Sequence, residues 1–156
     1  MLRINTPIGK LTIVQKDGLI TNIFFDGEEP KDAIFEEHPV LRMAEKQIAE
    51  YFSGMRKVFN LPLFLDGQTE ENFNIKVWRT MIDKVLFGST ITYGELASLC
   101  GSPNAARAVG MANNRNPLPL IIPCHRVIGK NGSLTGFRGG LDVKAKLLEF
   151  ESAILI

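Results

Sequence analysis

The sequence predicts an α+β fold in two parts, a small strand-rich N-terminal domain over residues 1–70 and a mostly helical domain over residues 71–156. Apolar residues alternate along the first 25 residues, as they do in half-buried strands, whereas from Ile75 onward they recur at helical spacing. The charge divides at the same place. The first part has 8 basic and 11 acidic residues, a net charge of −3, and the second has 10 and 6, a net charge of +4.

Composition excludes several classes of protein. The chain has 156 residues, of which 45% are hydrophobic and 22% charged, so it has enough apolar material for a core and is not disordered. No run of about 18 apolar residues predicts a membrane span, and the N-terminus lacks the apolar stretch of a signal peptide. Because Cys100 and Cys124 cannot form a disulfide framework, we expect a reducing compartment, the cytoplasm.

The charge pattern bears on nucleic-acid binding. The whole chain carries only +1, which argues against a nucleic-acid binder. Its basic second part is nevertheless compatible with a surface that faces phosphates. Ordinary surface charge remains an alternative at this level.

The first part is expected to contain a hairpin and one helix. Lys16-Asp17-Gly18 is typical of a tight hairpin turn, and apolar residues from Val40 to Phe52 recur at helical spacing before Gly54. In chain order the predicted elements are strands within residues 1–25, an acidic turn-rich stretch at 26–39, a helix over 40–52, a strand over 59–65 broken by Pro62, and a linker at 66–69.

The second part is expected to begin with helices. Thr92 and Glu95 match a capping box, in which each side chain bonds the backbone N–H of the other residue. Ser102 and Pro103 match the N-cap and first position of the next helix. Two short helices joined by a tight turn are typical of a helix-turn-helix, although many helical hairpins bind nothing. The helices are predicted over 75–86, 92–99 and 102–109.

The chain is expected to be extended after Asn116, because three prolines between 117 and 123 exclude a helix there. Leu120-Ile121-Ile122 is predicted to be a buried strand that ends at Cys124. Residues 129–140 hold five of the 14 glycines, which predicts a mobile or tightly turning loop. A last helix is predicted over 143–150.

Cys124 and His125 are the most reactive-looking pair. A thiolate is the nucleophilic form of cysteine, and a nearby imidazole can lower the thiol pKa or accept its proton. Neighbouring residues of a strand point to opposite faces, so a buried cysteine beside an unrelated histidine remains an alternative. His38 is expected to be a solvated surface residue. The cysteines and histidines lack metal-ligand spacing, so neither a metal nor a cofactor is predicted.

The string Pro123-Cys124-His125-Arg126-Val127 is similar to the active-site signature of the O6-alkylguanine-DNA alkyltransferases, the methylated-DNA–protein-cysteine methyltransferases. The resemblance covers roughly residues 72–151. It implies a ribonuclease H-like N-terminal domain and a winged-helix-like C-terminal domain with a helix-turn-helix. Further matches in family order and spacing are Val77-Trp78, Thr92–Ala97, Ala105–Gly110, Ala112-Asn113, Asn116-Pro117, Gly139-Gly140, Lys144, Leu147-Leu148 and Glu151.

The resemblance implies roles for the residues around the cysteine. Cys124 would take the alkyl group from guanine O6 in one irreversible displacement, so that each molecule acts once. His125 would act as base toward Cys124 through a bridging water. Glu151 would orient His125 and stabilise its charge, and the Leu-Leu-x-x-Glu spacing selects it over its neighbour Glu149.

The resemblance also implies how the damaged base is held. Tyr93 would donate its hydroxyl to the extruded guanine, and the Val127 carbonyl would accept from the guanine amino group. The backbone N–H of Arg138 would reach guanine O6, so a change of that side chain should be tolerated. Asn116 would support the turn before the cysteine.

In such relatives the second helix of the helix-turn-helix enters the minor groove. Arg107 would fill the space that the flipped base leaves, and the small residues Ala106, Ala108 and Gly110 would let the helix approach closely. Met111 departs from the family, in which a smaller residue is usual, and so does the Val-Leu-Phe-Gly sequence at 85–88.

The implied partner is double-stranded DNA that carries O6-alkylguanine, with O4-alkylthymine left open, bound by a monomer and without a membrane. One alternative is a non-catalytic relative that only binds alkylated DNA, but such relatives carry another residue where Cys124 stands. A second alternative is a cysteine hydrolase, which would need an oxyanion site and usually a histidine distant in sequence.

Overall fold

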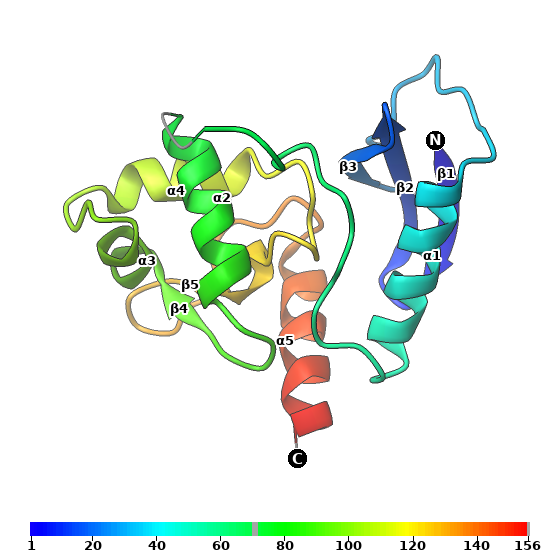
Figure 1. Cartoon of the computed structure of the whole chain (residues 1–156). Helices are drawn as coiled ribbons and strands as arrows, with labels where there is room; N and C mark the ends of the chain where they lie inside the picture. The colour runs from blue at the N-terminus through cyan, green and yellow to red at the C-terminus, as the bar shows by residue number, and fades with distance from the viewer. Residues whose placement is uncertain (70–71, 156) are drawn as a thin grey trace. The chain divides into compact units, whose positions relative to one another are not determined.

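The computed structural model describes residues 1–69 and 72–155, and the chain divides into two compact units, Met1–Gly67 and Gln68–Ile156. The first unit is a small antiparallel sheet with one helix, and the second is mostly helical (Figure 1). The predicted α+β class is therefore confirmed. The predicted boundary between residues 70 and 71 lies outside the described residues.

The first unit is a three-stranded antiparallel sheet in the order β1-β2-β3, with α1 packed against it (Figure 1). Asp17 and Gly18 join β2 to β3 with φ angles of 54° and 80°, the left-handed conformation that a two-residue hairpin turn requires. Leu11, Ile13 and Ile23 of the sheet are buried with the apolar face of α1. The elements are β1 (Leu2–Thr6), β2 (Gly9–Lys16), β3 (Leu19–Phe25) and α1 (Pro39–Phe52).

His38 has a structural role that the sequence did not reveal. It is half-buried, and its Nδ1 accepts a hydrogen bond from the backbone N–H of Val40 (3.1 Å), which caps the N-terminus of α1. The expectation of a solvated surface residue was therefore wrong. Pro39 follows at the first helical position, where its missing N–H costs no hydrogen bond.

The strand predicted over 59–65 is absent. Only Leu63 forms a bridge with a strand residue, Ile20, and this bridge is parallel. Pro62 has no N–H to donate and interrupts the ladder. Two backbone hydrogen bonds to Ile20, from its N–H to the Pro62 carbonyl (2.8 Å) and from the Phe64 N–H to its carbonyl (3.0 Å), hold the segment at this bridge. The side chain of Gln47 holds its start, because it donates to the Asn60 carbonyl (2.9 Å) and accepts from the Asn60 N–H (2.8 Å).

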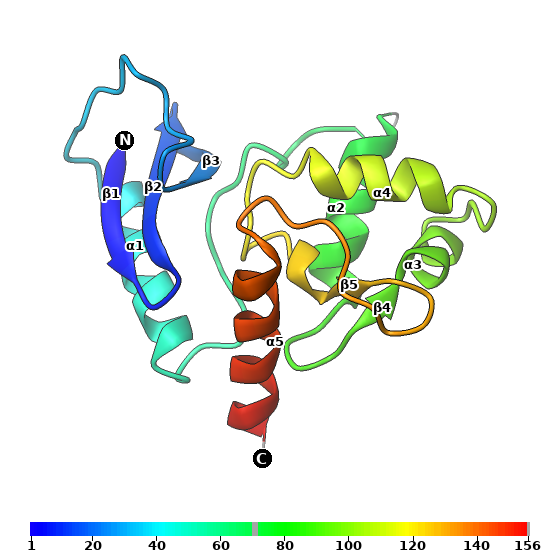
Figure 2. The same ribbon diagram turned by 180° about the vertical axis from the view of Figure 1, so that it is seen from behind.

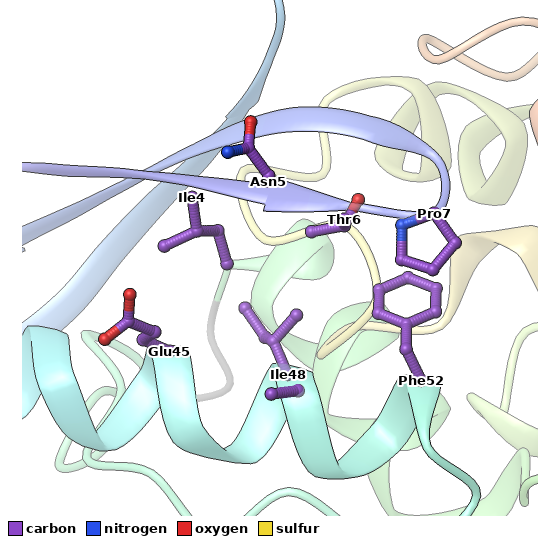
Figure 3. Close-up of a pocket in the computed structure, with 8 residues that line it drawn as sticks. Ile4, Asn5, Thr6, Pro7, Glu45, Ile48 and Phe52 are labelled. Atoms are coloured by element: carbon purple, nitrogen blue, oxygen red, sulfur yellow. The ribbon is translucent and has the colours of Figure 1, made fainter.

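A cavity of about 460 Å³ opens between β1 and α1 (Figure 3). Ile4 and Ile48 point toward each other across it, and the Phe52 ring lies against Pro7. Glu45, its one charged residue, pairs with Arg42 on the same helix. None of the residues that line this cavity is a cysteine or a histidine.

The second unit packs three helices together and joins them to a short parallel pair of strands, β4 and β5 (Figure 2). The buried indole of Trp78 in α2 donates to the Ala112 carbonyl of α4 (2.8 Å). No helix in the described ranges is long and apolar enough to cross a membrane. The elements are α2 (Phe73–Lys84), β4 (Ile91–Thr92), α3 (Tyr93–Leu99), α4 (Ala106–Asn114), the 3-10 helix η1 (Cys124–Arg126), β5 (Val127–Ile128) and α5 (Leu141–Leu155).

The start of the helix α4 differs from its prediction. Ser102 and Pro103 do not begin it, because the chain makes a turn in which the Ala105 N–H donates to the Ser102 carbonyl (2.9 Å). The helix begins at Ala106, with no side-chain cap, and continues to Asn114, beyond the predicted end at Val109.

The buried strand predicted over 120–122 is also wrong. The Ile122 N–H donates to the Leu118 carbonyl (2.8 Å) and the Cys124 N–H to the Ile122 carbonyl (2.7 Å), so the segment is a series of turns. Leu120 has a φ of 76°, which a strand excludes and which is strained for a residue with a Cβ. These turns lead directly to Cys124.

Candidate active site

Cys124 begins the one-turn helix η1, and His125 is its second residue. The Cys124 side chain is 6% exposed and that of His125 is fully buried. Because the pair lies on a 3-10 helix and not on a strand, the objection that neighbouring side chains must point to opposite faces does not apply. Both cysteines of the chain are free thiols.

Glu151 reaches this pair from α5 and is itself buried. His125 Nε2 donates to Glu151 Oε2 (2.7 Å). Arg126 makes a fork to the same carboxylate, from Nε to Oε1 (2.8 Å) and from Nη2 to Oε2 (3.0 Å). The backbone N–H of Gly88 also donates to Oε1 (3.1 Å), and Arg126 Nη1 donates to the Val85 carbonyl (2.8 Å). The carboxylate is therefore fixed from several sides.

Electrostatics set the protonation of this set. Burial alone would raise the pKa of Glu151, but the hydrogen bonds from His125 and Arg126 and their positive charge hold it well below its usual range. Burial lowers the pKa of His125, against the opposing effect of Glu151. The ionised carboxylate accepts from Nε2–H, so Nδ1 is the basic nitrogen of the ring. No described protein atom bonds this buried Nδ1.

The Cys124 thiol is not ionised by its surroundings. Burial raises its pKa, and a hydrogen bond from the Asn116 side chain and the charges of Lys144 and Arg138 oppose that rise without cancelling it. A thiol that is neutral near pH 7 needs a base before it can attack, and His125 is the adjacent candidate.

Asn116 lies just after α4, 2% exposed, and holds the turns that lead to the cysteine. Its side-chain Nδ2 donates to the Ile122 carbonyl (2.8 Å), and its Oδ1 accepts from the Leu118 N–H (2.8 Å). The bond to Ile122 reaches the end of the segment in which the sequence suggested a strand, and the bond to Leu118 holds the residues just before it. The Asn116 side chain therefore holds this turn at both ends.

Tyr93 is the first residue of α3, where the predicted capping box is present. The Thr92 N–H donates to Glu95 Oε1 (3.0 Å), and the Glu95 N–H donates to Thr92 Oγ1 (3.1 Å). The Tyr93 hydroxyl accepts a hydrogen bond from Thr135 Oγ1 (3.1 Å). A Cβ at Gly110 would lie 3.9 Å from the Tyr93 ring, so this small residue of α4 faces the tyrosine.

Val127 is buried in β5, directly after η1, and its carbonyl oxygen accepts from Lys144 Nζ (2.6 Å). The same fully buried ammonium donates to the Thr135 carbonyl (2.7 Å). Burial lowers the pKa of Lys144, and the negative charge that Cys124 carries as a thiolate opposes this effect. Lys144, Arg126 and Thr135 are site residues to which sequence reasoning assigned no role.

The residues expected to contact DNA lie on α4. Arg107 is exposed on this helix, with Ala106 and Ala108 half-buried beside it. None of the hydrogen bonds around Cys124 involves these three residues. Arg138, by contrast, belongs to the hydrogen-bonded residues around Cys124, because its Nη1 donates to the Asn116 carbonyl (2.6 Å). Within the described residues, no group of three or more histidine, cysteine or acidic side chains could hold a metal ion.

The chain has a strand-rich unit followed by a helical unit that buries a cysteine, a histidine and a glutamate. Two family models match these two parts and identify a class of two-domain DNA methyltransferases. The model for the 6-O-methylguanine DNA methyltransferase ribonuclease-like domain matches residues 3–65, and the model for the DNA-binding domain of the same enzyme matches residues 72–153.

Individual relatives agree. The chain is 42% identical to the constitutive methylated-DNA–protein-cysteine methyltransferase of Bacillus subtilis strain 168, over 94% of this chain and 91% of that one. It is 43% identical to the Methanosarcina acetivorans enzyme of the same name, over 95% of each chain. The structure resembles that of Mycobacterium tuberculosis OGT in complex with DNA, with a TM-score of 0.86, 38% identity and 97% and 92% coverage of the two chains. The chain belongs to the methylated-DNA–protein-cysteine methyltransferase family.

Proposed function

We propose that this protein repairs DNA by moving the alkyl group of O6-alkylguanine onto Cys124, once per molecule. The observation that carries the proposal is the buried Cys124–His125 pair with His125 Nε2 on Glu151. The relatives named above are methylated-DNA–protein-cysteine methyltransferases, which supports this reaction class.

In the first step His125 acts as base. Its Nδ1 takes the proton of the Cys124 thiol through a bridging water, which leaves a thiolate and an imidazolium. Glu151 stabilises the imidazolium through Nε2–H, as the acidic member of other nucleophile triads does. The ion pair between Glu151 and Arg126 keeps the carboxylate ionised at neutral pH.

In the second step the thiolate attacks the alkyl carbon. A sulfur–carbon bond forms while the carbon–O6 bond breaks, and its electron pair leaves with the guanine. Tyr93 donates a hydrogen bond from its hydroxyl to the departing base, which helps the base to carry that charge. The product is a thioether without a good leaving group, so the protein is not regenerated.

The base itself would be held by backbone groups of two segments. The Val127 carbonyl would accept from the guanine amino group, and the Arg138 backbone N–H would donate to O6. Asn116 would hold the Arg138 segment near Cys124, because its side chain holds the turns before the cysteine and its carbonyl accepts from Arg138.

The duplex would meet α4. We propose that the protein binds as a monomer and that α4 enters the minor groove. The small residues Ala106, Ala108 and Gly110 would permit the close approach of this helix. Arg107 would then fill the gap in the stack, where flipping a base costs a few kcal/mol. The free thiols of Cys100 and Cys124 fit a reducing compartment such as the cytoplasm.

Intact mass spectrometry tests the reaction directly. The protein is incubated with a duplex containing one O6-methylguanine, and the modified peptide is identified. We expect one methyl group on the Cys124 peptide, none with Cys124→Ala, and full modification with the matched control Cys100→Ala. A duplex with O4-methylthymine shows whether that base is a second substrate.

The two alternative functions predict different results. An unmodified wild-type protein that still binds the damaged duplex tightly would identify a non-catalytic alkylated-DNA binder. Repeated turnover on an ester or amide would identify a cysteine hydrolase. Either result contradicts the proposed function.

A further inference from the structure

The glycine-rich segment, residues 129–140, is tied to its surroundings by side chains rather than by a regular ladder. Figure 2 shows it as the loop that leaves β5 and returns to α5. Thr135 Oγ1 donates to the Tyr93 hydroxyl (3.1 Å), and Lys144 Nζ donates to the Thr135 carbonyl (2.7 Å). Arg138 makes a third tie, from Nη1 to the Asn116 carbonyl (2.6 Å).

The Arg138 tie ends on an unusually well-anchored residue. Asn116 is 2% exposed, and its side chain holds Leu118 and Ile122 at the two ends of the turn before Cys124. Arg138 is an exposed residue, yet its guanidinium donates a charge-assisted hydrogen bond to the carbonyl of this buried residue. Such bonds are about twice as strong as neutral ones.

We propose that the Arg138 side chain is a positioning residue for alkyl transfer, which fixes the glycine-rich segment to the Asn116 turn that carries Cys124. The proposal deepens the proposed function and rests on it. The family resemblance assigns a role only to the backbone N–H at this position and implies that side-chain changes are tolerated. The bond to Asn116 gives the Arg138 side chain a positioning role that is separate from the role of its backbone N–H.

The physical reason is the composition of the segment. Five glycines leave residues 129–140 with little intrinsic stiffness, so the position of a backbone N–H within it depends on external ties. A misplacement of about 1 Å can cost about a hundredfold in a positioned reaction. The Arg138 side chain would hold in place the backbone N–H of its own residue, which would donate to O6. It does so by bonding Asn116, whose side chain also holds the turns before Cys124.

The guanidinium also acts on the thiol by its charge. It opposes the rise that burial causes in the pKa of Cys124, together with Lys144 and the Asn116 side chain. Because the Arg138 side chain is exposed, solvent weakens this effect. The hydrogen bond to Asn116 is therefore the larger contribution of the Arg138 side chain. Arg138→Lys separates this bond from the charge effect on the thiol, because lysine keeps the charge but lacks the planar guanidinium.

Single-turnover kinetics test the proposal. The limiting rate at saturating O6-methylguanine duplex and the half-saturating duplex concentration are measured for wild type, Arg138→Met, Arg138→Lys and Lys130→Met. We expect Arg138→Met to lower the limiting rate by about tenfold or more and Arg138→Lys to recover part of it. Lys130→Met removes the same charge from the same segment and should leave the limiting rate unchanged.

A free-base substrate distinguishes positioning from phosphate contact. O6-benzylguanine has no phosphate, so a role in positioning predicts the same loss in Arg138→Met with this base as with the duplex. If Arg138→Met instead raises only the half-saturating duplex concentration and reacts with the free base like wild type, Arg138 contacts DNA and the proposal is overturned.

Two controls separate the outcomes. Thermal unfolding midpoints show whether each variant folds, and the rate of iodoacetamide modification against pH shows whether the thiol pKa has moved. Equal limiting rates for wild type and Arg138→Met would also overturn the proposal. Failure of the wild type to accept any methyl group would refute the proposed function instead, and the two failures cannot be confused.

Discussion

The Glu151 carboxylate is buried, with the Arg126 guanidinium bonded to both of its oxygens and His125 bonded to one of them. Arg126 donates through both Nε and Nη2, and His125 donates through Nε2. One negative charge thus compensates a buried arginine and selects the basic nitrogen of the histidine at the same time. Two properties, stability and reactivity, depend on one side chain.

Glu151→Gln should therefore damage both properties. The amide keeps the shape but leaves Arg126 buried without its counter-charge, which costs about 3 kcal/mol of the free energy of unfolding. It also weakens the preference for hydrogen on Nε2, so we expect alkyl transfer to slow by about a hundredfold or more. Chemical denaturation and single-turnover kinetics check the two effects.

The matched control is Glu149→Gln, an exposed carboxylate on the same helix. This variant should retain wild-type stability and rate. If Glu149→Gln impairs transfer and Glu151→Gln does not, the assignment of Glu151 is wrong.

Stability should fall as the solution is acidified. The pKa of Glu151 is lowered by folding from its ordinary value of 4.5, so its contribution is complete above that value and is lost as the pH falls through the folded pKa. The pKa of His125 is lowered from 6.5, so the unfolded chain takes up a proton first and stability already declines below about that pH. Denaturation at several pH values measures both declines.

Glu151→Gln isolates the carboxylate in this experiment. We expect its free energy of unfolding to lose the steep decline below pH 4.5 while the decline that begins near 6.5 is altered but present. A wild-type protein whose stability rises between pH 6.5 and 4.5 would contradict the sign of the His125 shift, and a rise below pH 4.5 would contradict that of the Glu151 shift.

The sequence predicted part of this site. Cys124, His125, Glu151 and Asn116 stand in a contiguous signature or at its family spacing, and the structure places them together. Arg126 and Lys144 received no role, because the resemblance assigned none to them and their bonds, to residues 25 and 17 positions away, leave no local pattern. Nothing in the local pattern tells a buried cation from an exposed one, since that depends on which elements meet.

At the level of elements, the short helix α3 places Tyr93, and its capping box is what starts it. Seven residues are few for an independent helix, so its N-terminus must be satisfied by side chains. The reciprocal bonds of Thr92 and Glu95 do this. Since Tyr93 is the first helical residue, the cap also fixes the direction of the phenol.

Thr92→Ala should lower the free energy of unfolding by about 1 kcal/mol, because the N-terminal N–H groups of α3 lose their acceptor. Urea denaturation measures this loss. Thr92→Ser keeps the hydroxyl and should behave as wild type. Equal stability of the alanine and serine variants would show that the cap contributes nothing.

The helix α4 carries the proposed contact with the duplex. Arg107→Ala should slow transfer from duplex DNA by about tenfold or more, since each 1.4 kcal/mol of lost compensation for base flipping is tenfold. The reaction with the free base O6-benzylguanine should not change, because no stack is disturbed. Single-turnover rates with both substrates make the comparison.

Arg115→Ala is the control for Arg107→Ala, since Arg115 is an exposed arginine at the other end of the same helix. It should keep the duplex rate at saturation. An equal loss with the free base in Arg107→Ala would place that residue in the chemistry instead of in the DNA contact.

The elements were predictable where local patterns decide them and not where a distant side chain does. The hairpin at Asp17-Gly18, the helix α1 and the capping box of α3 follow from turn chemistry and apolar spacing. The segment 120–122 is apolar enough for a strand, but Asn116 bends it into turns. The strand at 59–65 was lost because Pro62 breaks its ladder and Gln47 supplies other partners.

For the whole molecule, the net charge conceals two different parts. Residues 1–70 carry −3 and residues 71–156 carry +4, so the helical part alone has the sign that phosphates attract. Both parts match family models, yet the candidate chemistry lies entirely within residues 85–151.

DNA affinity should depend moderately on salt. If about four phosphates are neutralised, raising the salt from 50 to 200 mM lowers the affinity by about a hundredfold, through counterion release. Fluorescence anisotropy with an undamaged duplex measures the slope. An affinity that hardly changes with salt would show that charge does not drive the association.

The position of Glu151 in α5 has a consequence for synthesis. During translation Arg126 and His125 leave the ribosome 25 and 26 residues ahead of the carboxylate that both require. A nascent chain that has not yet released α5 has a cysteine but no oriented base, and a cation whose burial nothing offsets. On the proposed mechanism chemical competence would therefore appear late and together with complete folding, so that a protein that acts only once would not be consumed while its chain is unfinished.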